Sequence, residues 1–187
     1  MSARYRMTSV LGRWTLAIIT LASLGLATPS AASPRTLILN ADGLVGAPFG
    51  AAQRSVVAVI DRTLGAPTKD PTPTPFLAPC GVDAAASWGE LATFFDHGRF
   101  AGYSLGHRPM VGLRVAGGVQ PGERLSLAHH QFGSRLRTSS NQGGAWFVRT
   151  PTGRFFGFLW PSGPPPGPRT RIWTIEAGRV GCPALAP

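Results

Sequence analysis

Four histidines are the first side chains to consider for acid-base or metal chemistry: His97, His107, His129 and His130. His97 lies in an Asp-His-Gly-Arg segment that has the composition of a hairpin turn. His129 and His130 are neighbours on a predicted helix, where adjacent side chains point about 100° apart, so they cannot chelate one ion together. The sequence therefore predicts no metal site, no cofactor and no catalytic histidine.

The other catalytic residue types also lack a supporting pattern. The eight acidic residues are scattered singly, so no carboxylate pair for glycoside hydrolysis can be picked out. Ser104 and Ser126 occupy ordinary strand and helix positions, and there is no Gly-x-Ser-x-Gly motif. We expect a protein that is not an enzyme. A wall-directed hydrolase with no recognisable motif stays open as the alternative.

Aromatic residues alternate with arginines in the last third of the chain. Residues two apart on a strand share a face, so Phe156, Phe158 and Trp160 are expected to lie together, opposite Phe155 and Leu159. Tryptophan and arginine are enriched in the hot spots of protein interfaces. The candidate binding surface consists of four residues: Phe158, Trp160, Arg171 and Trp173. The alternative is that most of these rings fill the core.

Two similar stretches, residues 43–67 and 117–133, organise the chain. Each has a glycine-bounded turn, apolar residues at helical spacing and a terminal Leu-Gly or Phe-Gly. They predict helices over residues 51–64 and 123–132, the second with His129 on its inner face. Each helix is followed by segments with strand character, so the sequence predicts an α+β fold. It would consist of two tandem helix-plus-antiparallel-sheet repeats, residues 37–107 and 108–183, sharing one sheet with the helices packed on one face.

The strands are expected at residues 33–39, 84–88, 91–95, 100–105, 110–115, 145–150, 154–160 and 171–178. Residues 68–79 contain four prolines and no periodicity, which predicts a connecting loop. Residues 161–168 are also rich in proline and predict a stiff spacer. A polyproline ligand for a partner groove is the other interpretation of that spacer.

The first 32 residues have the features of a secretory signal peptide. Three arginines precede an apolar run over residues 14–27, and small residues end at Ala32. A run of 14 residues is shorter than the roughly 20 that a membrane-spanning helix needs. We expect cleavage after Ala32, which leaves a single secreted or cell-envelope domain, residues 33–187, without a membrane span. A membrane anchor is the alternative.

The exported part is basic. Three of the 18 basic residues and none of the eight acidic ones lie in the leader, so residues 33–187 carry a net charge of +7. Outside a cell this charge favours anionic wall polymers, lipid head groups or acidic proteins over nucleic acid, and such attraction weakens with salt. The charge is also consistent with a role in solubility alone.

The two cysteines, Cys80 and Cys182, both belong to the exported part, where thiols can pair. We expect one intramolecular disulfide, which would close a loop of about 100 residues and restrict the unfolded chain by roughly 4 to 5 kcal/mol. Two free buried thiols and an intermolecular pair are the alternatives. A zinc site is disfavoured because no further ligand lies close in sequence.

Several short motifs carry a resemblance. They are Gly-Leu-x-Gly-x-x-Phe-Gly from Gly43, Leu-Gly-x-Pro-Thr-x-Asp from Leu64, Cys-Gly at Cys80, Trp-Gly-x-Leu from Trp88, Phe-Gly at Phe132 and the final Ala-Gly-x-x-Gly-Cys. With them the chain resembles a family of secreted, uncharacterised actinobacterial proteins over nearly all of residues 37–182. The expected fold resembles that of the tandem-repeat beta-lactamase inhibitory protein and of small outer-membrane-assembly lipoproteins, which implies a sheet of about eight strands with helices on one face.

These observations together predict a secreted, non-enzymatic binding protein that acts as a monomer. Its partner is an unknown protein or an anionic cell-wall polymer, and inhibitor-like action is a special case that the fold resemblance implies.

Overall fold

The computed structural model describes residues 36–73, 79, 81–139, 144–161 and 166–180, all within one compact unit, Ala32–Pro187. The expected signal peptide, both cysteines of the expected disulfide and residues 162–165 of the proline-rich spacer lie outside the described residues. In the described part of the chain, no helix has the length and apolar character needed to cross a membrane.

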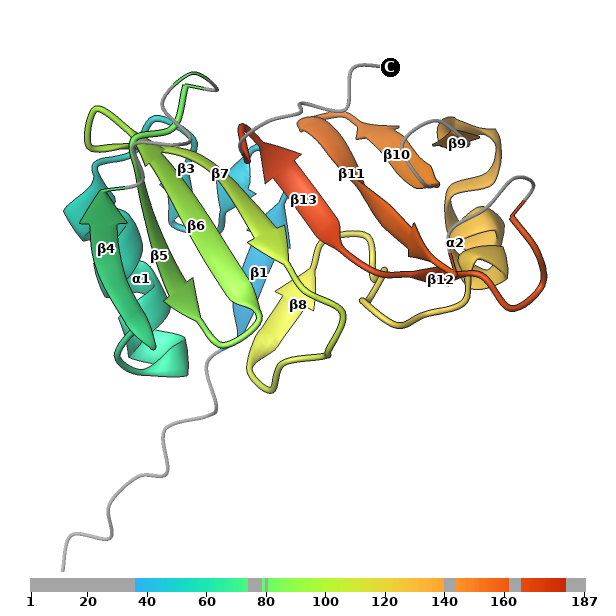
Figure 1. Cartoon of the computed structure of the whole chain (residues 1–187), viewed down its shortest axis with the longest axis horizontal. Helices are drawn as coiled ribbons and strands as arrows, with labels where there is room; N and C mark the ends of the chain where they lie inside the picture. Colours follow the sequence, from blue (N-terminus) through green and yellow to red (C-terminus); the bar gives the residue numbers. More distant parts are fainter. Residues whose placement is uncertain (1–35, 74–78, 80, 140–143, 162–165, 181–187) are drawn as a thin grey trace, which may run out of the picture. The chain divides into compact units, whose positions relative to one another are not determined.

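The protein is a mixed α+β structure whose largest element is a nine-stranded antiparallel sheet (Figure 1). Its strand order is β4 (Lys69–Pro73), β5 (Ala84–Trp88), β6 (Leu91–Asp96), β7 (Arg99–Leu105), β13 (Ile175–Gly178), β11 (Gly153–Trp160), β10 (Ala145–Thr150) and β9 (Leu136–Ser139), with β12 (Arg171–Ile172) beside β11. The β7–β13 pair, with Tyr103 opposite Ala177, joins the strands of the earlier part of the chain to those of the later part.

A second, four-stranded sheet has the order β3 (Ala47–Pro48), β2 (Gly43–Leu44), β1 (Leu37–Asn40) and β8 (Leu113–Val115). Strands β1 and β8 are parallel, with Leu39 opposite Val115. The Tyr103 hydroxyl donates to the Asn40 carbonyl oxygen at 2.9 Å, which links β7 of the large sheet to the end of β1.

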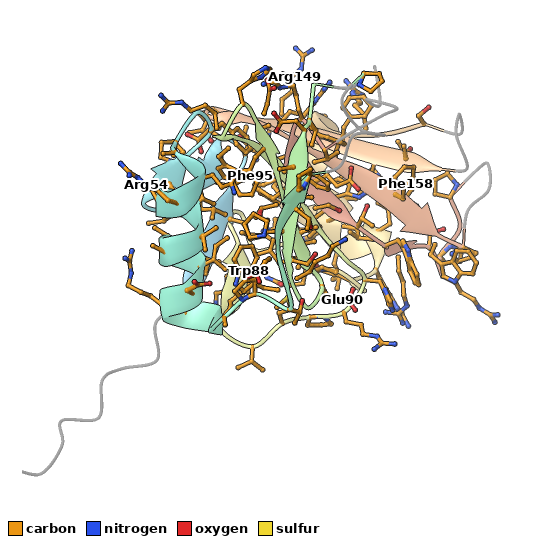
Figure 2. The ribbon with its side chains drawn as sticks, turned by 60° about the vertical axis from the view of Figure 1, so that its left-hand side comes forward. Arg54, Trp88, Glu90, Phe95, Arg149 and Phe158 are labelled. Carbon is orange, nitrogen blue, oxygen red and sulfur yellow. The ribbon has the colours of Figure 1, made fainter. Side chains whose placement is uncertain are left out.

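Helix α1 spans Gln53–Leu64, close to the expected range, and buries Val56 and Ile60. Gly65 follows with a φ of +81°, a backbone conformation that favours glycine and ends the helix. Trp88 Nε1 donates to Asp61 Oδ1 at 2.9 Å and to the Gly65 carbonyl oxygen at 3.1 Å, which ties β5 to the end of α1. Figure 2 shows Trp88 and Phe95 between the sheet and α1.

Helix α2 spans Leu125–Phe132 and is followed by a 3₁₀ turn, η2 (Gly133–Arg135). It buries Leu125, Ala128 and Phe132. The expectation that His129 lies on the inner face was wrong, because His129 is exposed. Ala128 occupies the buried position, and the next residue is rotated by about 100° toward solvent.

Two other expectations were wrong in part. Residues 68–79 contain the strand β4 and not only a loop; β4 is an edge strand, where proline is tolerated because one side of the strand makes no ladder bonds. Residues 171–178 form two short strands because the backbone N–H groups of Trp173 and Thr174 both donate to the Phe158 carbonyl oxygen, at 2.8 and 3.4 Å. Two residues therefore oppose one, as in a β-bulge.

One hydrophobic core unites both sheets and both helices. Phe155 and Leu159 of β11 belong to it, and so do Trp146 and Val148 of β10. Because successive side chains alternate between the two faces of a strand, the immediate sequence neighbours of these residues point away from this core. We call this other side of the large sheet the outer face; it carries Ser104, Phe147, Arg149, Phe156, Phe158, Trp160 and Glu176.

Candidate functional site

Two exposed tryptophans meet where β11 and β12 pair at one end of the outer face. Trp160 ends β11 and is 56% exposed, and Trp173 follows β12 and is 37% exposed. Their ring centroids are 5.5 Å apart and their planes differ by 41°. This distance lies in the range of interacting aromatic pairs, so the two indoles form one apolar surface that solvent reaches.

His107 holds one of these indoles in place. Its ring stacks on that of Trp173, with centroids 4.1 Å apart and planes within 5° of parallel. His107 comes from the segment that follows β7, so the contact joins distant parts of the chain. Sequence reasoning assigned His107 no role, and no local motif could have shown that its ring meets an indole 66 residues later.

Charged neighbours surround the His107 ring. Arg108 Nε donates to His107 Nε2 at 3.2 Å, and the Glu90 carboxylate lies 3.8 Å from His107 Nδ1 and 3.9 Å from Arg108 Nε. A Cβ on Gly106 would overlap Glu90 Oε2, so this glycine leaves room for the carboxylate. The exposed Arg108–Glu90 ion pair contributes about 0 to 1 kcal/mol, so the main effect of these contacts is to orient the His107 ring.

The other two residues of the expected surface lie at the same end of the outer face. Arg171 is directly opposite Trp160, and its Nη1 donates to the Gly122 carbonyl oxygen at 2.6 Å. Phe158 is partly buried, and its N–H donates to Thr174 Oγ1 at 3.0 Å. We call Phe158, Trp160, Arg171 and Trp173, together with His107, the tryptophan surface.

A carboxyl group is buried within the outer face. Glu176 of β13 is 7% exposed and lies between Ser104 of β7 and Phe156 of β11. Ser104 Oγ donates to Glu176 Oε1 at 3.3 Å. Burial raises the pKa of the Glu176 carboxyl, and hydrogen bonds from Thr174 and Ser104 oppose that rise. Sequence reasoning did not identify Glu176, because an isolated acid on a strand gives no signal.

Asp83, Asp96 and His97 place three possible metal ligand atoms within 4.8 Å of one another. These groups already have partners in the protein: Asp83 Oδ2 accepts from the His97 N–H at 2.9 Å, and Asp96 contacts His97 Nδ1 at 2.6 Å and Arg179 Nη2 at 2.8 Å. The hydrogen bond from His97 and the Arg179 guanidinium lower the pKa of Asp96. Because the Arg179 guanidinium already neutralises Asp96, we interpret Asp83, Asp96 and His97 as residues that stabilise the turn and not as metal ligands. His97 has a φ of +49° in this turn.

Comparison of the chain with protein-family models, with curated proteins and with solved structures gives no match. The functional interpretation therefore depends on the contacts and exposure of this chain's own residues.

Proposed function

We propose that residues 33–187 form a secreted, non-enzymatic binding protein of the cell envelope or extracellular space, whose partner is a protein that docks on the tryptophan surface. The observation that carries this proposal is the contact between Trp160 and Trp173, two large apolar rings that remain exposed. Complete burial of a large apolar side chain contributes about 1.5 to 3 kcal/mol, and these rings, at 56% and 37% exposure, leave part of that free energy unrealised. A partner that covers both rings would recover it.

The neighbouring groups suit recognition of a protein. The His107 stack and the Arg171 hydrogen bond restrict side chains that would otherwise lose conformational freedom on binding. Tryptophan and arginine are the residue types that contribute most in such interfaces. Inhibitor-like action, in which this face blocks an enzyme, is the special case that the expected fold resemblance suggests.

We infer in addition that the chain consists of two tandem repeats that share the large sheet. The strand order supports this, because β4 to β7 run inward from one edge in chain order, and β9, β10, β11 and β13 run inward from the other. Each set is preceded by a helix. The shared core supports the further inference that both helices cover the same face of the sheet.

The test is affinity capture from culture fluid and envelope extract with three immobilised forms of residues 33–187: wild type, Trp160→Ala/Trp173→Ala and Leu127→Ala. Leu127 is a matched control because it is 54% exposed but lies on α2. We expect one protein to be retained at moderate salt by the wild type and the control, and at least about tenfold less by the double variant.

Equal retention by all three forms would overturn the proposal, as would retention of no protein. The hydrolase alternative is tested in parallel by incubating the wild type with purified cell wall. Release of soluble fragments by the wild type, and none by Glu176→Gln, would replace the binding function with catalysis.

A further inference from the structure

We propose that the protein has a second, separate site, at which arginine side chains bind the phosphate groups of an anionic ligand. The site is a hollow of about 630 Å³ beside the edge strand β9, lined by Ser134, Arg135, Arg137, Thr138, Phe147 and Arg149. We call it the arginine hollow. Its volume falls within the range of small-ligand sites, about 300 to 1,000 Å³.

The arginines of this hollow have no carboxylate partner among the described residues. All eight acidic residues of the chain are described, and the arginine ion pairs found there join Glu90 to Arg108 and Asp96 to Arg179. No carboxylate of the described part therefore lies within 4.0 Å of the guanidinium nitrogens of Arg135, Arg137 or Arg149. Their positive charge is available to an external anion.

The strand register adds a further unneutralised charge. Arg149 of β10 is directly opposite Arg154 of β11, and like charges at such positions repel and destabilise a sheet. The Arg154 guanidinium lies over the Phe156 ring at 5.6 Å, which absorbs part of this cost. A bound anion would relieve the repulsion between the two arginines. Anion binding therefore accounts for a pairing that destabilises the free protein.

The positions of the side chains favour phosphate. Two contacts with Phe132 orient Arg135: its Nε donates to the Phe132 carbonyl oxygen at 3.4 Å, and its guanidinium lies 5.9 Å from the Phe132 ring centre. Arg137 is opposite Phe147, and Arg149 follows two residues later on the same face. Guanidinium groups bind phosphate oxygens through paired hydrogen bonds, and the hydroxyls of Ser134 and Thr138 add donors.

This hollow is distinct from the tryptophan surface. Figure 2 shows Arg149 at the opposite end of the sheet from Glu90, which lies beside His107. Substitutions in the arginine hollow should therefore leave the tryptophan surface intact, and the reverse also holds.

The test is isothermal titration calorimetry of oxidised residues 33–187 at low and moderate salt. The three ligands are inorganic phosphate, a poly(glycerol phosphate) and a polyglutamate of similar length. The variants are Arg137→Gln/Arg149→Gln and the control Arg54→Gln/Arg114→Gln. Both pairs are exposed and remove the same net charge, but Arg54 is on α1 and Arg114 on β8. Melting temperatures check that each variant is folded.

We expect binding of the phosphate polymer to weaken at least about tenfold in the hollow variant and less than about twofold in the control. Binding of inorganic phosphate with the same pattern would show that a single phosphate group suffices, whereas binding of the polymer alone would show that a phosphodiester chain is needed; both support the site. Equal weakening in the two variants, equal affinity for polyglutamate, or no binding would overturn the proposal.

Discussion

The indole Nε1 of Trp146 donates a hydrogen bond of 3.1 Å to the carbonyl oxygen of Thr174, across the intervening strand β11. The residue of β11 opposite Trp146 is Gly157, and a Cβ there would overlap the Thr174 carbonyl oxygen. Thr174 Oγ1 also accepts the Phe158 N–H. These two hydrogen bonds hold Thr174, the residue that follows Trp173, against β10 and β11.

The first prediction concerns this junction. Gly157→Ala should destabilise residues 33–187 by about 3 kcal/mol, because the added methyl group meets backbone atoms that cannot move without breaking the sheet. Urea unfolding measures the loss. The control is Gly167→Ala, because nothing lies within 4 Å of a Cβ at that exposed position. Equal stability of the two variants would show that the Thr174 carbonyl does not occupy this space.

A second prediction tests the link between β5 and α1. Trp88→Phe should cost about 2 to 4 kcal/mol in unfolding free energy, since it removes both indole hydrogen bonds and leaves a void in the core. Asp61→Ala should cost only about 1 kcal/mol because the indole keeps the Gly65 carbonyl. Asp70→Ala, at an exposed position, is the control. Equal costs for the two contact variants would argue against the shared hydrogen bond.

The sequence predicted most of the fold where the pattern is local. The alternation around Phe95 and Phe155 identified their strands, and Asp96 to Arg99 identified a hairpin turn whose central residues, His97 and Gly98, have positive φ. It failed where tertiary context decides. Strand β4 forms despite its prolines because it lies at an edge, and the break at Trp173 depends on a carbonyl oxygen of another strand.

The candidate site was predictable only in part for the same reason. Phe158, Trp160, Arg171 and Trp173 were identified because residue type and strand period are visible in sequence. His107 and Glu90 were not, because their contacts depend on which strands become neighbours. The same holds for Arg137 and Arg149, which line one hollow and have no carboxylate partner among the described residues. The aromatic residues in the last third of the chain are divided between the core and the surface: Trp146 and Phe155 are buried, and Trp160 and Trp173 are exposed.

A third prediction concerns the pH dependence of stability. Burial raises the pKa of Glu176 above its ordinary value of 4.5, while the unfolded chain ionises near that value. The native state therefore holds more protons between the two pKa values, and stability falls as the pH rises through this window. Glu176→Gln cannot ionise, so the variant should be more stable than the wild type at pH 7 and similar to it at pH 4.

Urea unfolding of both proteins at pH 4 and pH 7 measures this difference. Ser104→Ala serves as a control that loses the hydrogen bond but keeps the ionisable group, so it should retain the wild-type direction of the pH dependence. Equal unfolding free energies of Glu176→Gln and the wild type at both pH values would show that burial does not destabilise the ionised carboxylate.

The last prediction tests the geometry of the tryptophan surface without a partner. Residues 33–187 contain four tryptophans, of which Trp88 and Trp146 are buried and Trp160 and Trp173 are exposed, so acrylamide should quench only part of the fluorescence. Trp160→Phe and Trp173→Phe should each reduce the quenchable part, and Trp88→Phe should reduce the protected part. His107→Ala uncovers one face of the Trp173 ring and should increase quenching, but only when Trp173 is present. An equal effect of His107→Ala in the Trp173→Phe background would mean that the stack is not what shields this indole.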